Sequence, residues 1–93
     1  MEIDEVSVNE ALKMYASGDF IIVDVRSVRE FDDYHHKDAI HVVLNDDFEV
    51  EVSKLDKNKK YLVHCLSGTR SDIACKIMKK LGFLEVYNVL GPM

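Results

Sequence analysis

Two short, nearly continuous apolar runs constrain the fold of this 93-residue chain more than any other feature of its sequence. The run from Phe20 to Val25 is broken only by Asp24, and the run from Lys60 to His64 is apolar at its centre. Such runs are typical of central strands in a parallel sheet, buried on both faces. Segments with helical periodicity alternate with these strands. This order predicts an α/β fold, a single doubly wound layer structure with a mainly parallel central sheet flanked by helices.

Local signals place the other elements. Ser7 with Glu10 and Ser27 with Glu30 have the spacing of capping boxes, which open helices. The segment from Asp46 to Leu55 fits both a strand and a helix, because its apolar residues satisfy either period. The remaining elements are expected as a helix from Ser7 to Gly18, a helix from Ser27 to about Tyr34, a strand from Ala39 to Leu44, a helix from Asp72 to Leu81 and a strand from Glu85 to Val89.

Charge and cysteine content limit the partners and the compartment. The net charge of −5 argues against a general nucleic-acid or membrane-surface binder, so we expect neither nucleic acid nor a membrane as a partner. No basic region followed by an apolar one marks an export signal, and two cysteines are too few for a disulfide scaffold. A bare thiol in such a chain predicts a reducing, cytoplasmic location.

Cys65 stands where the second apolar run ends, and a short loop leads from it into an amphipathic segment. In a doubly wound sheet, ligands bind beyond the carboxyl ends of the strands. The N-terminus of the following helix offers unpaired N–H groups and a partial positive charge, and Gly68 allows the loop to turn more N–H groups inward. A thiol at this place loses its proton more easily, and the thiolate is the reacting species. We therefore expect Cys65 to be a nucleophile rather than a buried structural thiol.

Several motifs carry a family resemblance. The stretch from Tyr61 to Ser71 contains the pattern Cys-x-x-Gly-x-Arg-Ser, and Asp24-Val25-Arg26 is followed by Glu30-Phe31. Together these resemble the active-site stretch and the first signature of the rhodanese-like domain family, in its small single-domain form. The resemblance implies one rhodanese-like domain over residues 1–93. It continues at His35, Ala39-Ile40, Ala74, Leu81-Gly82-Phe83, Val86-Tyr87 and Gly91.

The resemblance implies a sulfurtransferase of the thiosulfate (rhodanese) type that works without a cofactor. Cys65 would take a sulfane sulfur from a donor such as thiosulfate, hold it as a persulfide, and pass it to cyanide or a thiol. The implied partners are a small sulfur-containing anion and a thiol or persulfide partner protein. The substrate-binding residues would be Leu66, Ser67, Gly68, Thr69, Arg70 and Ser71, supported by Asp24, Arg26 and Glu30.

The chain departs from the family pattern at four places. Tyr34 stands where glycine is usual, and Lys37-Asp38 replaces a Pro-Gly pair. Pro92 stands where a second glycine is common, and the chain ends at Met93, before the final helix that family members usually carry.

Individual side chains have competing interpretations. Arg70 either contacts an anionic donor or braces the loop by pairing with Asp24 or Glu30. Arg26 either lines the mouth of the pocket or pairs with Glu30, and the i,i+4 spacing favours the pair. Asp24 is expected to anchor the neighbouring loops by hydrogen bonds rather than to act as a general acid. Ser71 is expected to cap the following helix.

Cys75 and the four histidines have structural interpretations. Cys75 is expected to fill the core or its boundary, because ten helical positions separate it from Cys65. His64 is expected to point away from that cysteine. No histidine spacing resembles a zinc motif, so we expect no metal site.

Two other functions use the same features. Cysteine phosphatases and arsenate reductases share an anion-binding loop of the pattern His-Cys-(x)5-Arg, but Cys65 and Arg70 are separated by four residues instead of five. The shorter loop suits a single sulfur atom better than a phosphoryl group. A sulfur carrier or regulatory binding module with little turnover is the remaining alternative.

Overall fold

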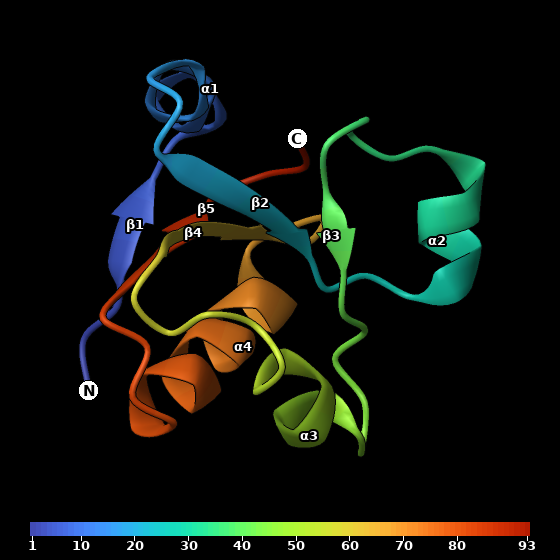
Figure 1. Cartoon of the computed structure of the whole chain (residues 1–93). Helices are drawn as coiled ribbons and strands as arrows, with labels where there is room; N and C mark the ends of the chain where they lie inside the picture. The colour runs from blue at the N-terminus through green and yellow to red at the C-terminus, as the bar shows by residue number, and fades with distance from the viewer.

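The computed structural model describes residues 1–93 as a five-stranded parallel sheet with helices on both faces, as the sequence predicted. The strand order is β1-β5-β4-β2-β3, so the two apolar runs are adjacent central strands (Figure 1). The elements are β1 (Asp4–Val6), α1 (Val8–Ala16), β2 (Phe20–Asp24), α2 (Val28–Asp33), β3 (Ile40–His41), α3 (Phe48–Val52), β4 (Lys60–His64), α4 (Thr69–Lys80) and β5 (Glu85–Val89).

The alternation of side chains along the central strands produces two cores. Tyr61 and Val63 of β4 face α3 and α4, in a cluster of 13 buried residues that also includes Phe48 and Met78. Leu62 faces the other way, toward α1, in a cluster of five. In Figure 1, α1 lies above the sheet, α3 and α4 lie below it, and α2 lies beyond the β3 end. None of the helices combines the length and the apolar composition that a membrane crossing requires.

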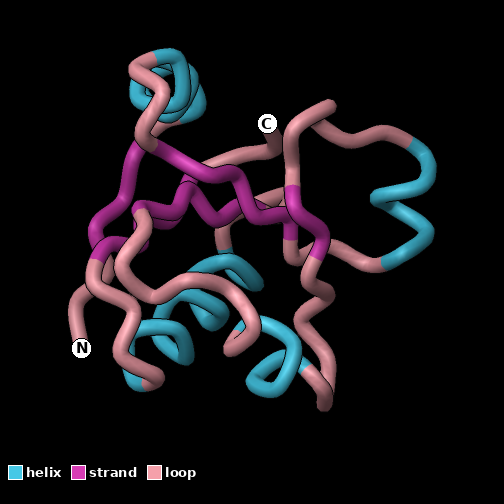
Figure 2. Tube along the Cα trace, viewed as in Figure 1, coloured by secondary structure: helices cyan, strands magenta, loops and turns pink.

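Three elements differ from the sequence predictions. β1 was not predicted, because only Val6 of its three residues is buried. The strand expected from Ala39 to Leu44 is reduced to Ile40–His41, although Val42 and Leu44 still donate backbone hydrogen bonds to β2 and the residue after it. Figure 2 shows that the chain on both sides of β3 is loop.

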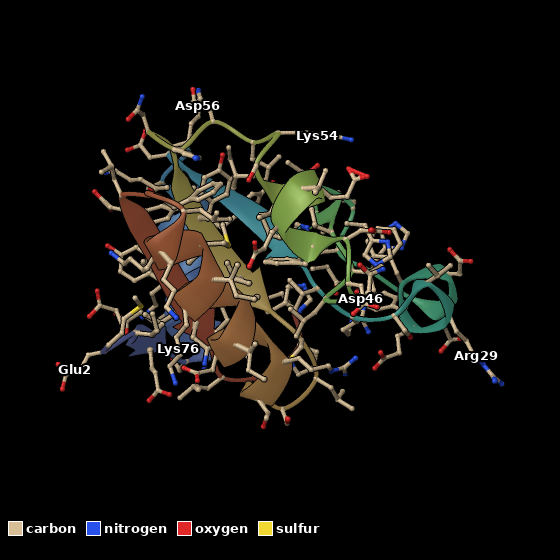
Figure 3. All side chains as sticks on the ribbon, turned by 90° about the horizontal axis from the view of Figure 1, so that it is seen from below. Glu2, Arg29, Asp46, Lys54, Asp56 and Lys76 are labelled. Atoms are coloured by element: carbon tan, nitrogen blue, oxygen red, sulfur yellow. The ribbon has the colours of Figure 1, made fainter.

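The segment that fitted either a strand or a helix forms α3, because Phe48 and Val52 are buried at helical spacing while Val50 is 67% exposed. α4 begins at Thr69, three residues before the expected start at Asp72. The loop between β4 and α4 is therefore only residues 65–68. Charged side chains such as Arg29, Lys54 and Lys76 point away from the core (Figure 3).

Candidate active site

Cys65 follows directly after β4, at the carboxyl end of the sheet, with α4 starting four residues later. Its side chain is fully buried. Parallel strands direct their carboxyl ends to one edge, which also brings Asp24 and Arg26 from the end of β2 to this region. The short loop and the first turn of α4 therefore surround the sulfur with backbone groups.

Three hydrogen-bonding groups lie around the Cys65 sulfur. The Gly68 N–H donates to Sγ at 3.2 Å and the Ser71 N–H donates at 3.4 Å, while Ser71 Oγ lies 3.3 Å from Sγ. Gly68 adopts a φ of +96°, a conformation that costs little only for glycine. That turn directs its N–H toward the sulfur. A Cβ at this position would also lie 3.3 Å from Cδ2 of Leu90.

The environment of Cys65 lowers its pKa, although burial acts in the opposite direction. Desolvation alone would raise the pKa of the thiol, but it is outweighed by hydrogen bonds from the Ser71 side chain and from the N–H groups of Ser71, Gly68 and Ser67. Cys75, buried in α4 without such donors, has its pKa raised to about 12, chiefly by desolvation. Both cysteines are free, and Cys75 belongs to the core as predicted.

Arg70 pairs with Glu30, one of the two carboxylates considered for it. Nη1 of Arg70 donates to Oε1 at 2.7 Å and Nη2 donates to Oε2 at 3.0 Å. Oε1 also accepts from the Ser27 N–H and hydroxyl, which completes the predicted capping box of α2. Hydrogen bonds from Arg70 and Ser27 lower the pKa of Glu30 to about 2. The pair ties the first turn of α4 to the start of α2.

The prediction that Arg26 pairs with Glu30 is wrong, because Asp24 is nearer and already buried. Nη2 of Arg26 lies 2.8 Å from Oδ2 of Asp24 and also donates to the Tyr34 carbonyl at 2.6 Å. Oδ1 of Asp24 accepts from the Arg26 backbone N–H at 2.9 Å. Asp24 thus holds the loop that follows β2 by hydrogen bonds.

His64 lies on the opposite side of β4 from the sulfur, directly across from Asp24 in the sheet register. It is fully buried, and its Nε2 lies 3.6 Å from Oδ2 of Asp24 without a hydrogen-bond partner. Desolvation lowers the pKa of His64, against the opposing effect of the Asp24 charge. His64 is therefore a buried structural residue next to Asp24 and does not face the sulfur.

The contacts of Ser71 and Asn88 differ most from those expected from the sequence. Ser71 does not cap α4, because the helix begins at Thr69 with Gly68 as its N-cap and places Ser71 inside the first turn. The Ser71 hydroxyl donates to Oδ1 of Asn88 at 2.5 Å, and Nδ2 of Asn88 donates to the Gly68 carbonyl at 3.1 Å. Sequence reasoning missed Asn88. The available signal was a polar residue within the apolar pattern of the last strand.

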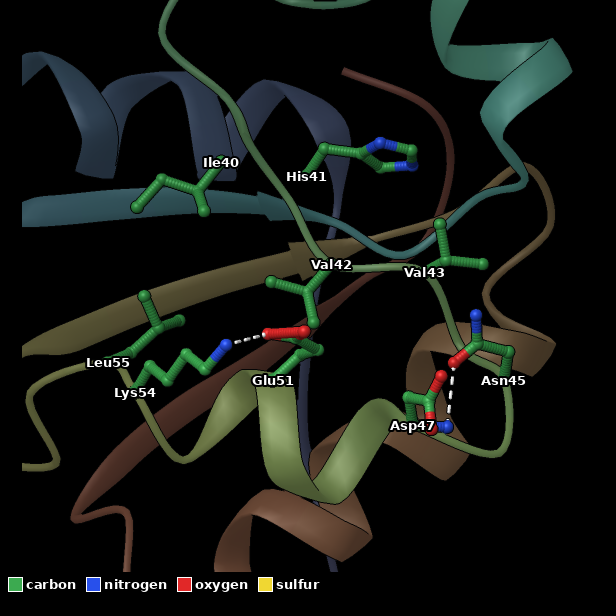
Figure 4. A pocket seen from close by; sticks show the side chains of 9 residues that line it. All are labelled: Ile40, His41, Val42, Val43, Asn45, Asp47, Glu51, Lys54 and Leu55. Carbon is green, nitrogen blue, oxygen red and sulfur yellow. Dashed lines mark hydrogen bonds and ion pairs between the residues drawn. The ribbon is translucent and has the colours of Figure 1, made fainter.

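The other loop side chains are not bonded to the sulfur. The Ser67 hydroxyl donates to the Thr69 hydroxyl at 3.3 Å, and Leu66 is 56% exposed. A surface pocket of about 520 Å³ lies elsewhere, between β3 and α3 (Figure 4), and shares no residue with the loop. It is lined by Ile40, His41, Val42, Val43, Asn45, Asp47, Glu51, Lys54 and Leu55.

Known proteins resemble the chain over most of its length. A family model described as the rhodanese-like domain matches residues 7–93. Thiosulfate sulfurtransferase GlpE of Coxiella burnetii is 31% identical over 87 residues, covering 94% of this chain and 80% of that protein. YrkF of Bacillus subtilis, provisionally named a sulfur carrier protein, is 36% identical over 93 residues; the match covers 98% of this chain but only 49% of YrkF.

A solved structure shares the same fold. The crystal structure of a rhodanese-like domain protein from Staphylococcus aureus has a TM-score of 0.84 at 25% identity, with 98% of this chain and 88% of that chain covered. The family match includes the whole stretch from β2 to the Cys65 loop. With its parallel sheet and its cysteine at the end of β4, this chain belongs to the rhodanese-like domain family.

Proposed function

We propose that this chain is a sulfurtransferase in which Cys65 carries a sulfane sulfur as a persulfide. The observation that carries the proposal is the set of hydrogen bonds around Sγ, from the N–H groups of Gly68 and Ser71. Donors fixed in this way stabilise a negative charge on sulfur without reorganisation. The relatives named above support sulfur chemistry, and GlpE supports thiosulfate as the donor.

The proposed reaction has two steps. The Cys65 thiolate attacks the outer sulfur of thiosulfate, a bond forms between the two sulfurs, and the S–S bond of thiosulfate breaks so that sulfite leaves with the electron pair. An acceptor, cyanide or a thiolate, then attacks the outer persulfide sulfur. Thiocyanate or a new persulfide leaves, and Cys65 returns as a thiolate. Both steps balance in atoms and electrons without an external oxidant or reductant.

Access to Cys65 is part of the proposal, because its side chain is buried. Leu66 and Leu90 are 56% and 49% exposed, and Leu90 packs over Gly68. A donor would approach the loop from the solvent side, where these two side chains are exposed. The partners are a small sulfur-containing anion and a protein thiol or persulfide, in the reducing cytoplasm that suits two free cysteines.

A sulfur carrier with little turnover is the second candidate, favoured by the similarity to YrkF. A carrier forms the same persulfide but hands it to a partner protein instead of turning over with a small acceptor. A phosphatase is disfavoured for two reasons. The loop has one residue fewer than the phosphatase pattern, and both terminal nitrogens of Arg70 are hydrogen-bonded to Glu30.

Mass spectrometry of the intact chain after exposure to thiosulfate tests the proposal. We expect a gain of one sulfur atom that dithiothreitol reverses. Cys65→Ser should not gain it, whereas the matched variant Cys75→Ser should. An adduct that persists in Cys65→Ser would refute the assignment. Multiple turnovers with cyanide would distinguish the enzyme from the carrier, which would give at most one sulfur per chain.

A further inference from the structure

Asn88 is a buried polar residue, with 1% of its surface exposed. It lies in β5, and its Nδ2 donates to the Gly68 carbonyl at 3.1 Å. This bond fixes the orientation of the amide, because the flipped amide would place two oxygens against each other. Oδ1 of Asn88 must therefore be the atom that faces Ser71, and it can only accept.

The hydroxyl of Ser71 has a single proton, and two atoms compete for it. Oγ of Ser71 lies 2.5 Å from Oδ1 of Asn88 and 3.3 Å from Sγ of Cys65. When the hydroxyl donates to Asn88, it presents only lone pairs to the sulfur. A protonated thiol then forms two successive hydrogen bonds with these groups, because S–H can donate to Oγ while O–H donates to Oδ1.

A thiolate reverses this arrangement. Sulfur without a proton can only accept, so the hydrogen bond between Oγ and Sγ persists only if the Ser71 hydroxyl turns toward Sγ and leaves Oδ1 of Asn88 without its proton. We propose that Asn88 is a positioning residue for Cys65, whose Oδ1 competes with the sulfur for the hydroxyl proton of Ser71 and so favours the thiol over the thiolate. This inference rests on the proposed role of Cys65 as the reacting thiol.

The other charged and titratable groups around the sulfur have partners other than Asn88. Arg70 of α4 interacts with the Cys65 charge and is paired with Glu30 of α2, and Cys75 lies further along α4. Behind the loop, Asp24 is paired with Arg26 and lies near His64. None of these side chains hydrogen-bonds to the Asn88 amide.

The test is the pH dependence of Cys65 alkylation by iodoacetamide in the full chain, followed by peptide mapping. Asn88→Leu removes the competing acceptor at similar volume. We expect its midpoint to move to lower pH by about 0.5–1, because one hydrogen bond is worth about 1 kcal/mol and one pH unit corresponds to 1.36 kcal/mol. Ser71→Ala should move the midpoint to higher pH. The double variant should match Ser71→Ala, because Asn88 acts only through the hydroxyl.

Asn88→Asp keeps an acceptor for Ser71 and loses the donor to Gly68, and its negative charge near the sulfur also disfavours the thiolate, so we expect it to move the midpoint to higher pH. If Asn88 only anchored the loop, Asn88→Leu would loosen the N–H donors around the sulfur and would also move the midpoint to higher pH. A midpoint for Asn88→Leu that stays or rises, or a double variant that differs from Ser71→Ala, would overturn the inference. Should Asn88→Leu not fold, as judged by circular dichroism, Asn88→Ala carries the same expectation. Alkylation does not require sulfur transfer, so the thiosulfate mass gain reports separately on the proposed function.

Discussion

Arg70 and Glu30 form a two-point ion pair across 40 residues of sequence, with N–O distances of 2.7 and 3.0 Å. Both terminal nitrogens of the guanidinium are directed at the carboxylate. The same carboxylate caps α2 through Ser27, so the pair connects the start of α2 to the first turn of α4. Of the two roles considered for Arg70, the geometry matches bracing of the loop.

Arg70→Lys tests the bracing role. Lysine keeps the charge but loses the second contact. We expect the free energy of unfolding, measured by urea denaturation, to fall by no more than about 1 kcal/mol, because the pair is partly exposed. Thiosulfate-to-cyanide transfer should fall more clearly. Lys76→Gln, which breaks the exposed Lys76–Asp72 pair on the same helix, is the control and should leave transfer unchanged. Undiminished transfer in Arg70→Lys would mean that the two-point contact with Glu30 is not required for transfer.

The two cysteines should differ in reactivity although both are buried. The pKa of Cys65 is lowered, whereas the pKa of Cys75 is raised to about 12. Because the thiolate is the reacting form, iodoacetamide at neutral pH should label Cys65 at least about tenfold faster than Cys75. Peptide mapping over time measures both rates in one sample. Equal rates would mean that the loop does not activate its thiol.

Gly68→Ala should damage the loop through its backbone. A residue with a side chain at this φ costs about 1–2 kcal/mol, which urea denaturation can measure. The new Cβ would also press on Leu90, so the N–H that donates to the sulfur should move and Cys65 alkylation should slow.

Gly18→Ala is the matched control for this substitution, because Gly18 has a φ of +93° and a Cβ added there would meet nothing within 4 Å. It should lose similar stability and keep the Cys65 rate. A Gly68→Ala protein with an unchanged alkylation rate would show that the Gly68 N–H does not contribute to activation.

Buried His64 should make the fold sensitive to mild acid. Its pKa is lowered in the folded protein, chiefly by desolvation, while the unfolded chain binds the proton near pH 6.5. The unfolded state thus holds more protons below about pH 6.5, and the free energy of unfolding falls as the pH decreases from there. Urea denaturation at pH 8, 6.5 and 5 should show a smaller decrease in His64→Leu. His35→Gln, at an exposed position, controls for loss of a histidine. An identical decrease in His64→Leu and the wild type would locate the sensitivity elsewhere.

The sequence predicted the parts of the fold that depend on local pattern. The strands from Phe20 and from Lys60 were identified because both faces are buried, which makes the runs continuous. β1 was not predicted, because its partner strand β5 is more than 80 residues away in the chain. The Ser27–Glu30 box was visible because its partners are three residues apart.

In the site, too, local motifs were predictable from the sequence and long-range contacts were not. Cys65 and Gly68 stand in one local motif, and their spacing is visible in the sequence itself. Arg26 could reach Asp24 or Glu30 from its position in the chain, and only the three-dimensional arrangement selects Asp24. Asn88 is 17 residues from Ser71 and 20 from Gly68, so no short-range pattern connects them.

All the groups that bond to the Cys65 sulfur come from a contiguous heptapeptide, residues 65–71. A segment of this length can be transplanted between parallel sheets by exchanging one strand-to-helix connection. The transplanted heptapeptide would contain the thiol, but its conformation would not be fixed. The two residues outside it that hold it in place are Glu30, which pairs with Arg70, and Asn88, which donates to the Gly68 carbonyl, and the receiving protein would have to supply both. A graft that supplies a carboxylate at the place of Glu30 should therefore retain the geometry of the loop, whereas an amide at the place of Asn88 should hold the Gly68 carbonyl and shift the sulfur toward its thiol form.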